Sequence, residues 1–227
     1  AGEGHDSATQ GHGKDSRRGQ DWIMEKLGPK HPIALDASAA HGLLHRLDRE
    51  TSGGILCAKS YLGSYMAQLQ FEAGQLRKTY LCLCENHAPV TCPWFIELPL
   101  ANSRGKSVVS DRGKYAKTEV VQVVHLQDSG GSCSLLKVVL HTGRLHQIRA
   151  HLASLGYPIL GDEMYGGRPG WRVLLHASRL QLDVPSLATS LDAQAAFPED
   201  FQLALETMSP CNLKCAFDLR LLSGTVA

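Results

Sequence analysis

Two neighbouring β-rich runs, residues 119–126 and 134–140, constrain the fold of this chain more than any other sequence feature. Strand-forming residues such as Val dominate both runs, and the polar, Gly-containing segment from Gln127 to Cys133 separates them. The pattern predicts an antiparallel β-hairpin with a long loop. Antiparallel pairing is therefore expected in the sheet.

Further strands and isolated helices surround this hairpin in the sequence. The segment 186–200 has no clear periodicity and is predicted to be largely loop. Strands interleaved with isolated helices favour an α+β fold with a mixed or antiparallel sheet. The predicted strands are residues 79–84 and 172–184, and the predicted helices are residues 59–74, residues 144–155 and a short one following Pro198 through Met208.

The helix predicted over residues 59–74 has clear signals at both ends. Ser60 can cap its first turn, and Gly74 can end it. Its apolar residues at helical spacing are Leu62, Met66 and Leu69.

Composition limits the class of protein. The 227 residues are 43% hydrophobic and 20% charged, which is typical of a soluble globular protein, and no apolar stretch is long enough to span a membrane. Residues 1–20 are polar and Gly-rich and are predicted to be a disordered tail, with a single domain over residues 21–227. The net charge of +1 means that a nucleic-acid partner would have to bind a local basic patch.

Cysteine usage bears on the cellular environment. The seven cysteines are odd in number and form no Cys-x-x-Cys pair. This favours an intracellular reducing compartment (cytoplasm, nucleus, mitochondrion or plastid) over a secreted disulfide framework.

Residues 45–54, His-Arg-Leu-Asp-Arg-Glu-Thr-Ser-Gly-Gly, form the first motif that points to chemistry. Asp48 lies between Arg46 and Arg49, and nearby positive charge favours the ionised form of a carboxyl group. An ionised Asp beside an RNA-attracting Arg is a candidate nucleophile. The alternative is a surface loop with an ordinary ion pair, which stabilises a protein little.

A second motif lies in the helix predicted over residues 144–155. Arg149 falls at the edge of the apolar stripe, about 40° from Leu145 when residues are spaced by 100°. A guanidinium at the edge of a core needs a partner, and Asp48 is a natural candidate. The alternative is an Arg whose stem packs while its charged end stays in water.

The same region is rich in hydrogen-bond donors. If Thr142-Gly143 opens the helix, backbone N–H groups near Arg144 could bind a phosphate. The alternative is a solvated polar face. The donors are Arg144, His146, Gln147, Arg149 and His151.

Two other features of the sequence each allow two interpretations. Tyr80 follows Arg77 and Lys78 in a predicted strand, so it is either half-buried packing or part of an RNA-facing edge. The segment 103–117 carries five basic residues and suits phosphate contact, although a solvated loop fits equally well.

The histidines and cysteines do not predict a metal site. His141, His146 and His151 are five residues apart, which separates successive side chains by about 140° on a helix. Cys211 and Cys215 have no companion His or Cys at a familiar interval.

Taken in order, these motifs resemble the RluA-type pseudouridine synthase family from about residue 41 to residue 185. The family usually opens with a strand that carries a Lys-Pro-x-Gly turn, of which Lys30-His31-Pro32 is a faint echo, so the first strand is expected to be missing. The stretches that carry the resemblance are His45–Gly53, Lys78–Leu81, Ala116–Glu119, Thr142–His151, Gly156–Asp162 and Leu175–Ala177.

The resemblance implies a pseudouridine synthase catalytic fold, with a mixed, mostly antiparallel sheet flanked by helices and a central active-site cleft. It implies isomerisation of uridine to pseudouridine in structured RNA (rRNA or tRNA), by a monomer, without a metal or an organic cofactor. The alternative is a non-catalytic RNA-binding module on the same scaffold.

Carried over by position, the resemblance also implies roles for individual residues. Asp48 would be the nucleophile, and Arg149 would pair with Asp48 and fix its orientation. Tyr80 would stack on the target base or handle a proton, and Arg46 would hold the nucleotide outside its stack. The other residues expected to bind the substrate are Thr51, Arg144, His146 and Gln147.

Overall fold

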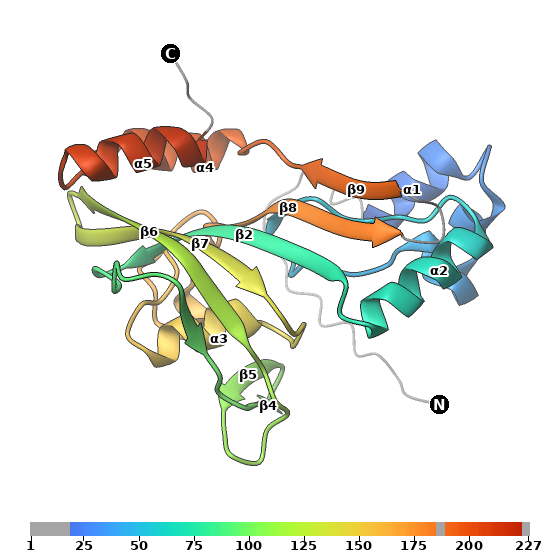
Figure 1. The fold of residues 1–227 in the computed structure, drawn as a ribbon, viewed down its shortest axis with the longest axis horizontal. Coiled ribbons are helices and arrows are strands. Elements are labelled where there is room, and N and C mark those ends of the chain that lie inside the picture. Colours follow the sequence, from blue (N-terminus) through green and yellow to red (C-terminus); the bar gives the residue numbers. More distant parts are fainter. Residues whose placement is uncertain (1–18, 185–188, 224–227) are drawn as a thin grey trace.

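The structure, a computed structural model, describes residues 19–184 and 189–223. Eight strands of this part of the chain form one sheet in the order β1–β8–β2–β7–β6–β10, with β3 paired to β6 and β9 paired to β8 (Figure 1). The strands are β1 (Ser52–Gly53), β2 (Leu76–Glu85), β3 (Trp94–Ile96), β6 (Thr118–Asp128), β7 (Gly131–Leu140), β8 (Leu175–Val184), β9 (Thr189–Gln194) and β10 (Ser209–Pro210).

The pairing confirms the mixed, mostly antiparallel sheet that the sequence predicts. β1 runs parallel to β8, and the other paired strands of this sheet are antiparallel. The predicted hairpin is β6–β7, although its strands extend further than expected and leave only Ser129 and Gly130 between them. The long loop predicted between residues 127 and 133 is therefore wrong.

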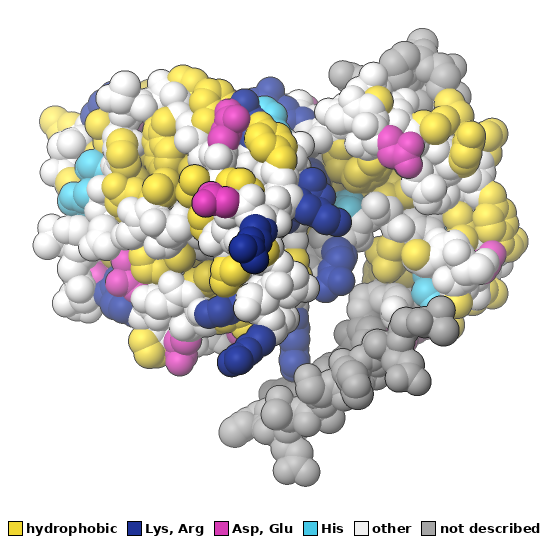
Figure 2. Space-filling view, turned by 90° about the horizontal axis from the view of Figure 1, so that it is seen from below, with side chains coloured by type: hydrophobic (Ala, Val, Ile, Leu, Met, Phe, Trp, Pro, Cys, Tyr) yellow, Lys and Arg dark blue, Asp and Glu magenta, His cyan; other side chains and the backbone are white. Residues whose placement is uncertain are grey.

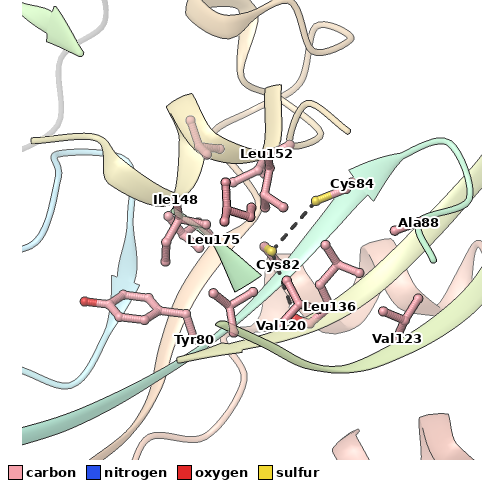
Figure 3. Packing of buried hydrophobic residues seen from close by; sticks show 14 of the residues in the cluster. Tyr80, Cys82, Cys84, Ala88, Val120, Val123, Leu136, Ile148, Leu152 and Leu175 are labelled. Carbon is pink, nitrogen blue, oxygen red and sulfur yellow. Dashed lines mark hydrogen bonds between the residues drawn. The ribbon is translucent and has the colours of Figure 1, made fainter. Parts of the chain in front are cut away.

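Helices cover both faces of the sheet, as Figure 1 shows. The face towards α3 packs alternate β2 residues, Tyr80 and Cys82 among them, against Ile148 and Leu152 (Figure 3). The helices are α1 (Gly19–Leu27), α2 (Tyr61–Glu72), α3 (Gln147–Ser154), α4 (Glu199–Glu206) and α5 (Leu213–Ser223), with short 3-10 turns η1 (Pro32–Leu35), η2 (Ala37–Gly42) and η3 (Glu163–Tyr165).

The opposite face of β2 packs against α4 and α5. Leu81 and Leu83 point to this side, where Phe201 of α4 and Cys215 of α5 are buried. Because both faces are covered, β2 is an almost continuous run of buried residues rather than an alternation of apolar and polar ones.

A two-stranded hairpin, β4 (Leu100–Ser103) and β5 (Lys106–Val109), lies apart from the main sheet (Figure 1). Its inner end is fixed near α3, because the hydroxyl of Ser107 donates a hydrogen bond to the carbonyl of Leu145. The basic residues predicted to lie in a loop at 103–117 are therefore partly on an ordered hairpin, with Arg104 and Gly105 at its tip.

Several predicted elements are confirmed and others are corrected. The helix at 59–74 is α2, and Ser60 caps it by accepting a hydrogen bond from the backbone N–H of Gly63. Its buried face is not the apolar one, however, because Ser64, Ala67 and Gln70 are buried while the side chain of Leu62 is 71% exposed. The apolar spacing in α2 thus marks a surface rather than the core.

The remaining corrections concern the two ends of the chain. Residues 189–194, predicted as loop, form edge strand β9, and α5 was not predicted. The helix predicted from Pro198 is α4. Most of the tail predicted over residues 1–20 lies outside the described residues, and its last two residues begin α1.

Candidate active site

The segments that carry the predicted site residues meet at a cavity of about 430 Å³. It lies between the loop after residue 45, strand β2 and the turn that leads into α3. Of the predicted site residues, Asp48, Tyr80, Arg149, Arg46, Thr51, Arg144 and Gln147 line this cavity. His146 lies beside it, with its Nε2 atom 3.9 Å from Oδ1 of Asp48.

The loop that bears Asp48 is held by local and distant contacts. The backbone carbonyl of Asp48 accepts a hydrogen bond of 2.9 Å from the backbone N–H of Thr51, which closes a tight turn. Just beyond it, β1 pairs with β8, and the hydroxyl of Ser52 lies 2.9 Å from Nδ1 of His176. This pairing anchors the nucleophile candidate to a strand more than 120 residues further along the chain.

Gly53 makes this anchorage possible. Its φ of +120° is a backbone conformation that side chains disfavour, and a Cβ atom there would lie 2.3 Å from the carbonyl oxygen of Ala177. Only a residue without a side chain lets β1 approach β8 this closely.

Arg149 does not form the predicted ion pair with Asp48. Its guanidinium donates two hydrogen bonds of 2.7 Å to the carboxylate of Asp162, and both side chains are almost completely buried. The ring of Tyr165 lies 5.1 Å below the same guanidinium. Arg149 therefore adds positive charge to the wall of the cavity without being bonded to Asp48.

This arrangement leaves the Asp48 carboxylate free of a bidentate partner. Its side chain is 20% exposed and faces the cavity, and no hydrogen bond to it is present among the described residues. The sequence could not reveal Asp162 as the partner of Arg149, because it lies in an irregular turn after α3.

A chain of contacts connects His146 to the β4–β5 hairpin. The hydroxyl of Tyr165 donates to the carbonyl of Ser107 (3.0 Å) and accepts from its N–H (2.9 Å). Nδ1 of His146 lies 3.2 Å from the same hydroxyl, so this ring nitrogen is the donor. Burial lowers the pKa of His146 even though the charge of Asp48 opposes this shift. The neutral ring therefore presents Nε2 as an acceptor beside Asp48.

Tyr80 contributes a neutral phenol to the cavity. Burial, together with the nearby charge of Asp48, raises the pKa of Tyr80 to about 12. The ring packs on the core side of β2, and the hydroxyl end points away from the apolar cluster (Figure 3).

Gln147 and Arg144 differ from what their predicted roles require. The side-chain amide of Gln147 donates to Lys117 and Thr118, and its oxygen accepts from Thr142 and from the backbone N–H of Arg144. Gln147 thus has no free hydrogen-bonding group for RNA, and the Arg144 N–H is not available to a phosphate. The exposed Arg144 side chain also donates to the carbonyl of Tyr115.

The helix predicted from residue 144 begins only at Gln147, because His146 adopts a left-handed conformation with φ of 48°. A helix that begins there cannot place its first backbone N–H groups near Arg144. The phosphate site predicted at the start of this helix is therefore not supported by its geometry.

Lys78 is a cavity residue that the sequence marked only as part of a basic run before Tyr80. It lies on β2, two residues before Tyr80, and lines the same cavity. Burial lowers its pKa. His45 also lines this cavity, and it too was not predicted as a site residue.

The histidines and cysteines considered above as metal ligands do not come together into a site within the described part of the chain. No group of three or more His, Cys, Asp or Glu side chains there could hold an ion. His141 contacts Glu119, and His151 is buried against Thr118 and the carbonyl of Leu98. None of the helices described is long and apolar enough to cross a membrane.

Comparison with known proteins places these motifs in a family. The model of the family described as RNA pseudouridylate synthase matches residues 12–154. An uncharacterized RNA pseudouridine synthase of Chloroflexus aurantiacus is 36% identical over 194 residues, which are 82% of this chain and 60% of that protein. Ribosomal large subunit pseudouridine synthase D of Borreliella burgdorferi is 36% identical over 150 residues, which are 63% of this chain and 45% of that protein.

Solved structures show the same fold. Human RNA pseudouridylate synthase domain containing 1 has a TM-score of 0.65 with this chain at 25% identity, and the match covers 78% of both chains. The chain spans about half the length of the curated relatives that it matches.

Proposed function

The chain belongs to the RNA pseudouridylate synthase family, and from this premise we propose that it isomerises uridine to pseudouridine in a structured RNA. Asp48 is the proposed nucleophile. The observation that carries the proposal is the meeting of Asp48, Tyr80 and Arg149 at one cavity, although they come from three distant segments of the chain.

The reaction replaces the N1–C1′ bond between base and ribose by a C5–C1′ bond, and the product has the same composition as uridine. The Asp48 carboxylate makes a covalent link to the uridine, the N1–C1′ bond breaks and the base turns within the cavity. A C5–C1′ bond then forms, the C5 proton leaves to water, N1 takes up a proton from water and the carboxylate is released. The nucleophile is an acid side chain that needs only to be ionised and unencumbered.

The surroundings of Asp48 support this role. Because Asp162 takes both hydrogen bonds of the Arg149 guanidinium, the oxygens of Asp48 stay free to attack, while the guanidinium lies in the wall of the same cavity. Tyr80 has an aromatic ring for stacking on the base, and because its phenol is neutral it also has an O–H group for proton donation. His146 Nε2 offers an acceptor to the bound nucleotide, and Arg46 and Thr51 bind it at the mouth of the cavity.

Base extrusion fits the size and position of the site. A uridine inside a helix must leave its stack before C5 can be reached, at a cost of a few kcal/mol. The exposed Arg46 is the proposed cation that holds the extruded nucleotide. One relative compared above is named an RNA pseudouridine synthase and another a ribosomal large subunit pseudouridine synthase, so RNA of the large ribosomal subunit is the first substrate to test.

We also propose that residues 21–227 act as a single catalytic domain and as a monomer. One continuous sheet, with a hydrophobic core on each face, connects the segments that line the cavity. Size-exclusion chromatography with light scattering tests the monomer, and a dimer mass would reject it.

The experiment is tritium release from RNA that carries [5-³H]uridine. The wild-type chain should release tritium, and Asp48→Asn, which keeps the size of the side chain, should not. Asp218→Asn on α5 is the matched control, because it changes an Asp far from the cavity, and it should behave as wild type. Release by Asp48→Asn would overturn the proposal, whereas RNA binding without release by the wild type would support a binding module instead.

A further inference from the structure

Two hydrogen-bond donors of the cavity make no hydrogen bond of good geometry within the described part of the chain. Nζ of Lys78 makes no hydrogen bond there and has no carboxylate within 4.0 Å, although the side chain is largely withdrawn from water. Other lysines nearby differ: Nζ of Lys117, for example, lies 2.8 Å from Glu97. An unpaired cation in such a place is costly, so the site is suited to an anion.

The second donor is His45. Its Nε2 accepts a hydrogen bond of 3.0 Å from the backbone N–H of Leu56, so the neutral ring carries its proton on Nδ1. Nδ1 is buried and makes no hydrogen bond of good geometry, although the backbone of Arg46 lies close enough to the ring to raise its pKa slightly against the larger effect of burial. Burial, and after it the charge of Lys78, lowers the pKa of His45, so the ring is neutral and close to the ammonium group.

Lys78 stands at the junction of two cavities. It lines the active-site cavity and an adjoining one of about 860 Å³, and Leu140, Gly143 and Arg144 are likewise shared by both. If the target base fills the first cavity and a neighbouring nucleotide enters the second, the phosphodiester between them passes Lys78. Figure 2 shows Lys and Arg side chains gathered along one side of a hollow on this face of the molecule.

Gly143 keeps the ammonium group accessible. A Cβ atom at this position would lie 3.2 Å from Nζ of Lys78, and apart from the two chain neighbours of Gly143 no other atom of the described residues lies within 4 Å of it. The φ of Gly143 is not in the left-handed region, so the backbone does not require a glycine here. What the glycine provides is room beside the ammonium group. The gap that it leaves is directly against the unpaired cation.

We propose that Lys78 Nζ, with the neutral His45 ring near it, forms a seat for one phosphodiester group of the RNA, the one that links the target uridine to its neighbour. The Arg144 side chain borders the seat where it opens into the second cavity. The inference rests on the proposed function for the identity of the base, but not for the identity of the anion. Lys78 is thus a substrate-binding residue that sets the register of the RNA strand.

The first test needs no active enzyme. Binding of fluorescein-labelled decauridylate is measured by anisotropy at several salt concentrations. Loss of one phosphate contact in Lys78→Met should reduce the slope of log Kd against log salt by about 0.7 and weaken binding by about tenfold at low salt. Gly143→Ala should weaken it less, and Lys214→Met on α5, an exposed lysine far from the cavities, should match wild type. An unchanged slope for Lys78→Met would overturn the proposal.

The second test locates the phosphate. A short RNA around the uridine mapped by tritium release is made with one neutral methylphosphonate linkage at a time. For wild type, the neutral linkage beside the target uridine should raise KM by about tenfold, while for Lys78→Met it should change KM little. At saturating RNA the single-turnover rate of Lys78→Met should stay within about threefold of wild type, because the contact serves binding more than chemistry.

The outcomes separate this inference from the proposed function. If Lys78→Met lowers the saturated rate and leaves KM and the salt slope unchanged, Lys78 acts on the base and the phosphate seat is wrong. If each neutral linkage raises KM by the same factor for wild type and for Lys78→Met, the phosphate seat is also wrong. If no RNA releases tritium but the salt slope changes as expected, the seat stands and the isomerase proposal fails.

Discussion

The buried pair of Arg149 and Asp162 gives the sharpest test of how this site is held together. The two side chains are 4% and 0% exposed and share two hydrogen bonds of 2.7 Å. Asp162→Asn removes the negative charge and turns an amide N–H₂ or a single oxygen towards the guanidinium. The guanidinium would then be a buried cation that has lost its counter-charge.

The expected loss of stability follows from these contacts. Hydrogen bonds to charged groups contribute about 1.5–3 kcal/mol each, and breaking a buried pair by changing one partner costs about 3–5 kcal/mol in total. We therefore expect the free energy of unfolding of Asp162→Asn to fall by about 3–5 kcal/mol, which lowers Tm by roughly 6–20 °C for a chain of this length. Urea unfolding followed by circular dichroism measures it.

Two further variants make the test specific. Asp192→Asn breaks an equally bidentate pair with Arg179, but those side chains are 41% and 37% exposed, so the unfolding midpoint should move little. The double variant Arg149→Met with Asp162→Leu removes both charges and should recover most of the lost stability while losing turnover. A loss below about 1 kcal/mol for Asp162→Asn would refute the reasoning, because it would mean that Arg149 finds water or another partner.

Three other predictions follow from the structure. Gly53→Ala should leave the circular dichroism spectrum close to wild type but reduce tritium release by about 100-fold, because a Cβ atom 2.3 Å from the Ala177 carbonyl oxygen would displace β1. Tritium release at the wild-type rate would contradict the role of this close approach. Between pH 10 and pH 12, wild type should lose up to about 2.7 kcal/mol more stability than Tyr80→Phe in urea unfolding, since the unfolded tyrosine ionises near 10 and the folded one near 12; parallel curves would argue against it. Burial lowers the pKa of His151, so below about pH 6.5 the unfolded chain binds a proton that the folded chain does not, and the free energy of unfolding falls as pH drops. For His151→Gln the free energy of unfolding should fall less steeply, by up to about 1.4 kcal/mol per pH unit. The same pH dependence in wild type and His151→Gln would exclude this cause.

Much of the architecture could be predicted from local sequence patterns. The β6–β7 runs and the buried run of β2 are strong strand signals, and Ser60 and Gly74 mark the ends of α2 as expected. Edge strand β9 was missed because Ser, Asp and Gln fill much of it, and its stability comes from pairing with β8 rather than from strand propensity.

Within the candidate site, the sequence indicated which residues line the cavity better than it indicated which side chains form hydrogen bonds with each other. The pattern around Asp48 and the helix-edge position of Arg149 indicated that the two residues lie near each other, and both line one cavity, but the predicted ion pair between them is absent. The partner of Arg149 could not be predicted, because Asp162 reaches it from a turn whose path depends on tertiary packing. Likewise, nothing local in the sequence indicates that the Gln147 amide is fully occupied, since its partners Lys117 and Thr118 belong to a distant segment.

The parallel contact between β1 and β8 determines when the cavity can form during synthesis of the protein. Ser52 and its partner His176 are 124 residues apart, and a ribosome that adds about 5–20 residues per second needs roughly 6–25 s to cover that distance. Throughout that interval the nascent loop with Asp48 has no strand to dock against, so the cavity that this loop lines cannot be complete until β8 has been made.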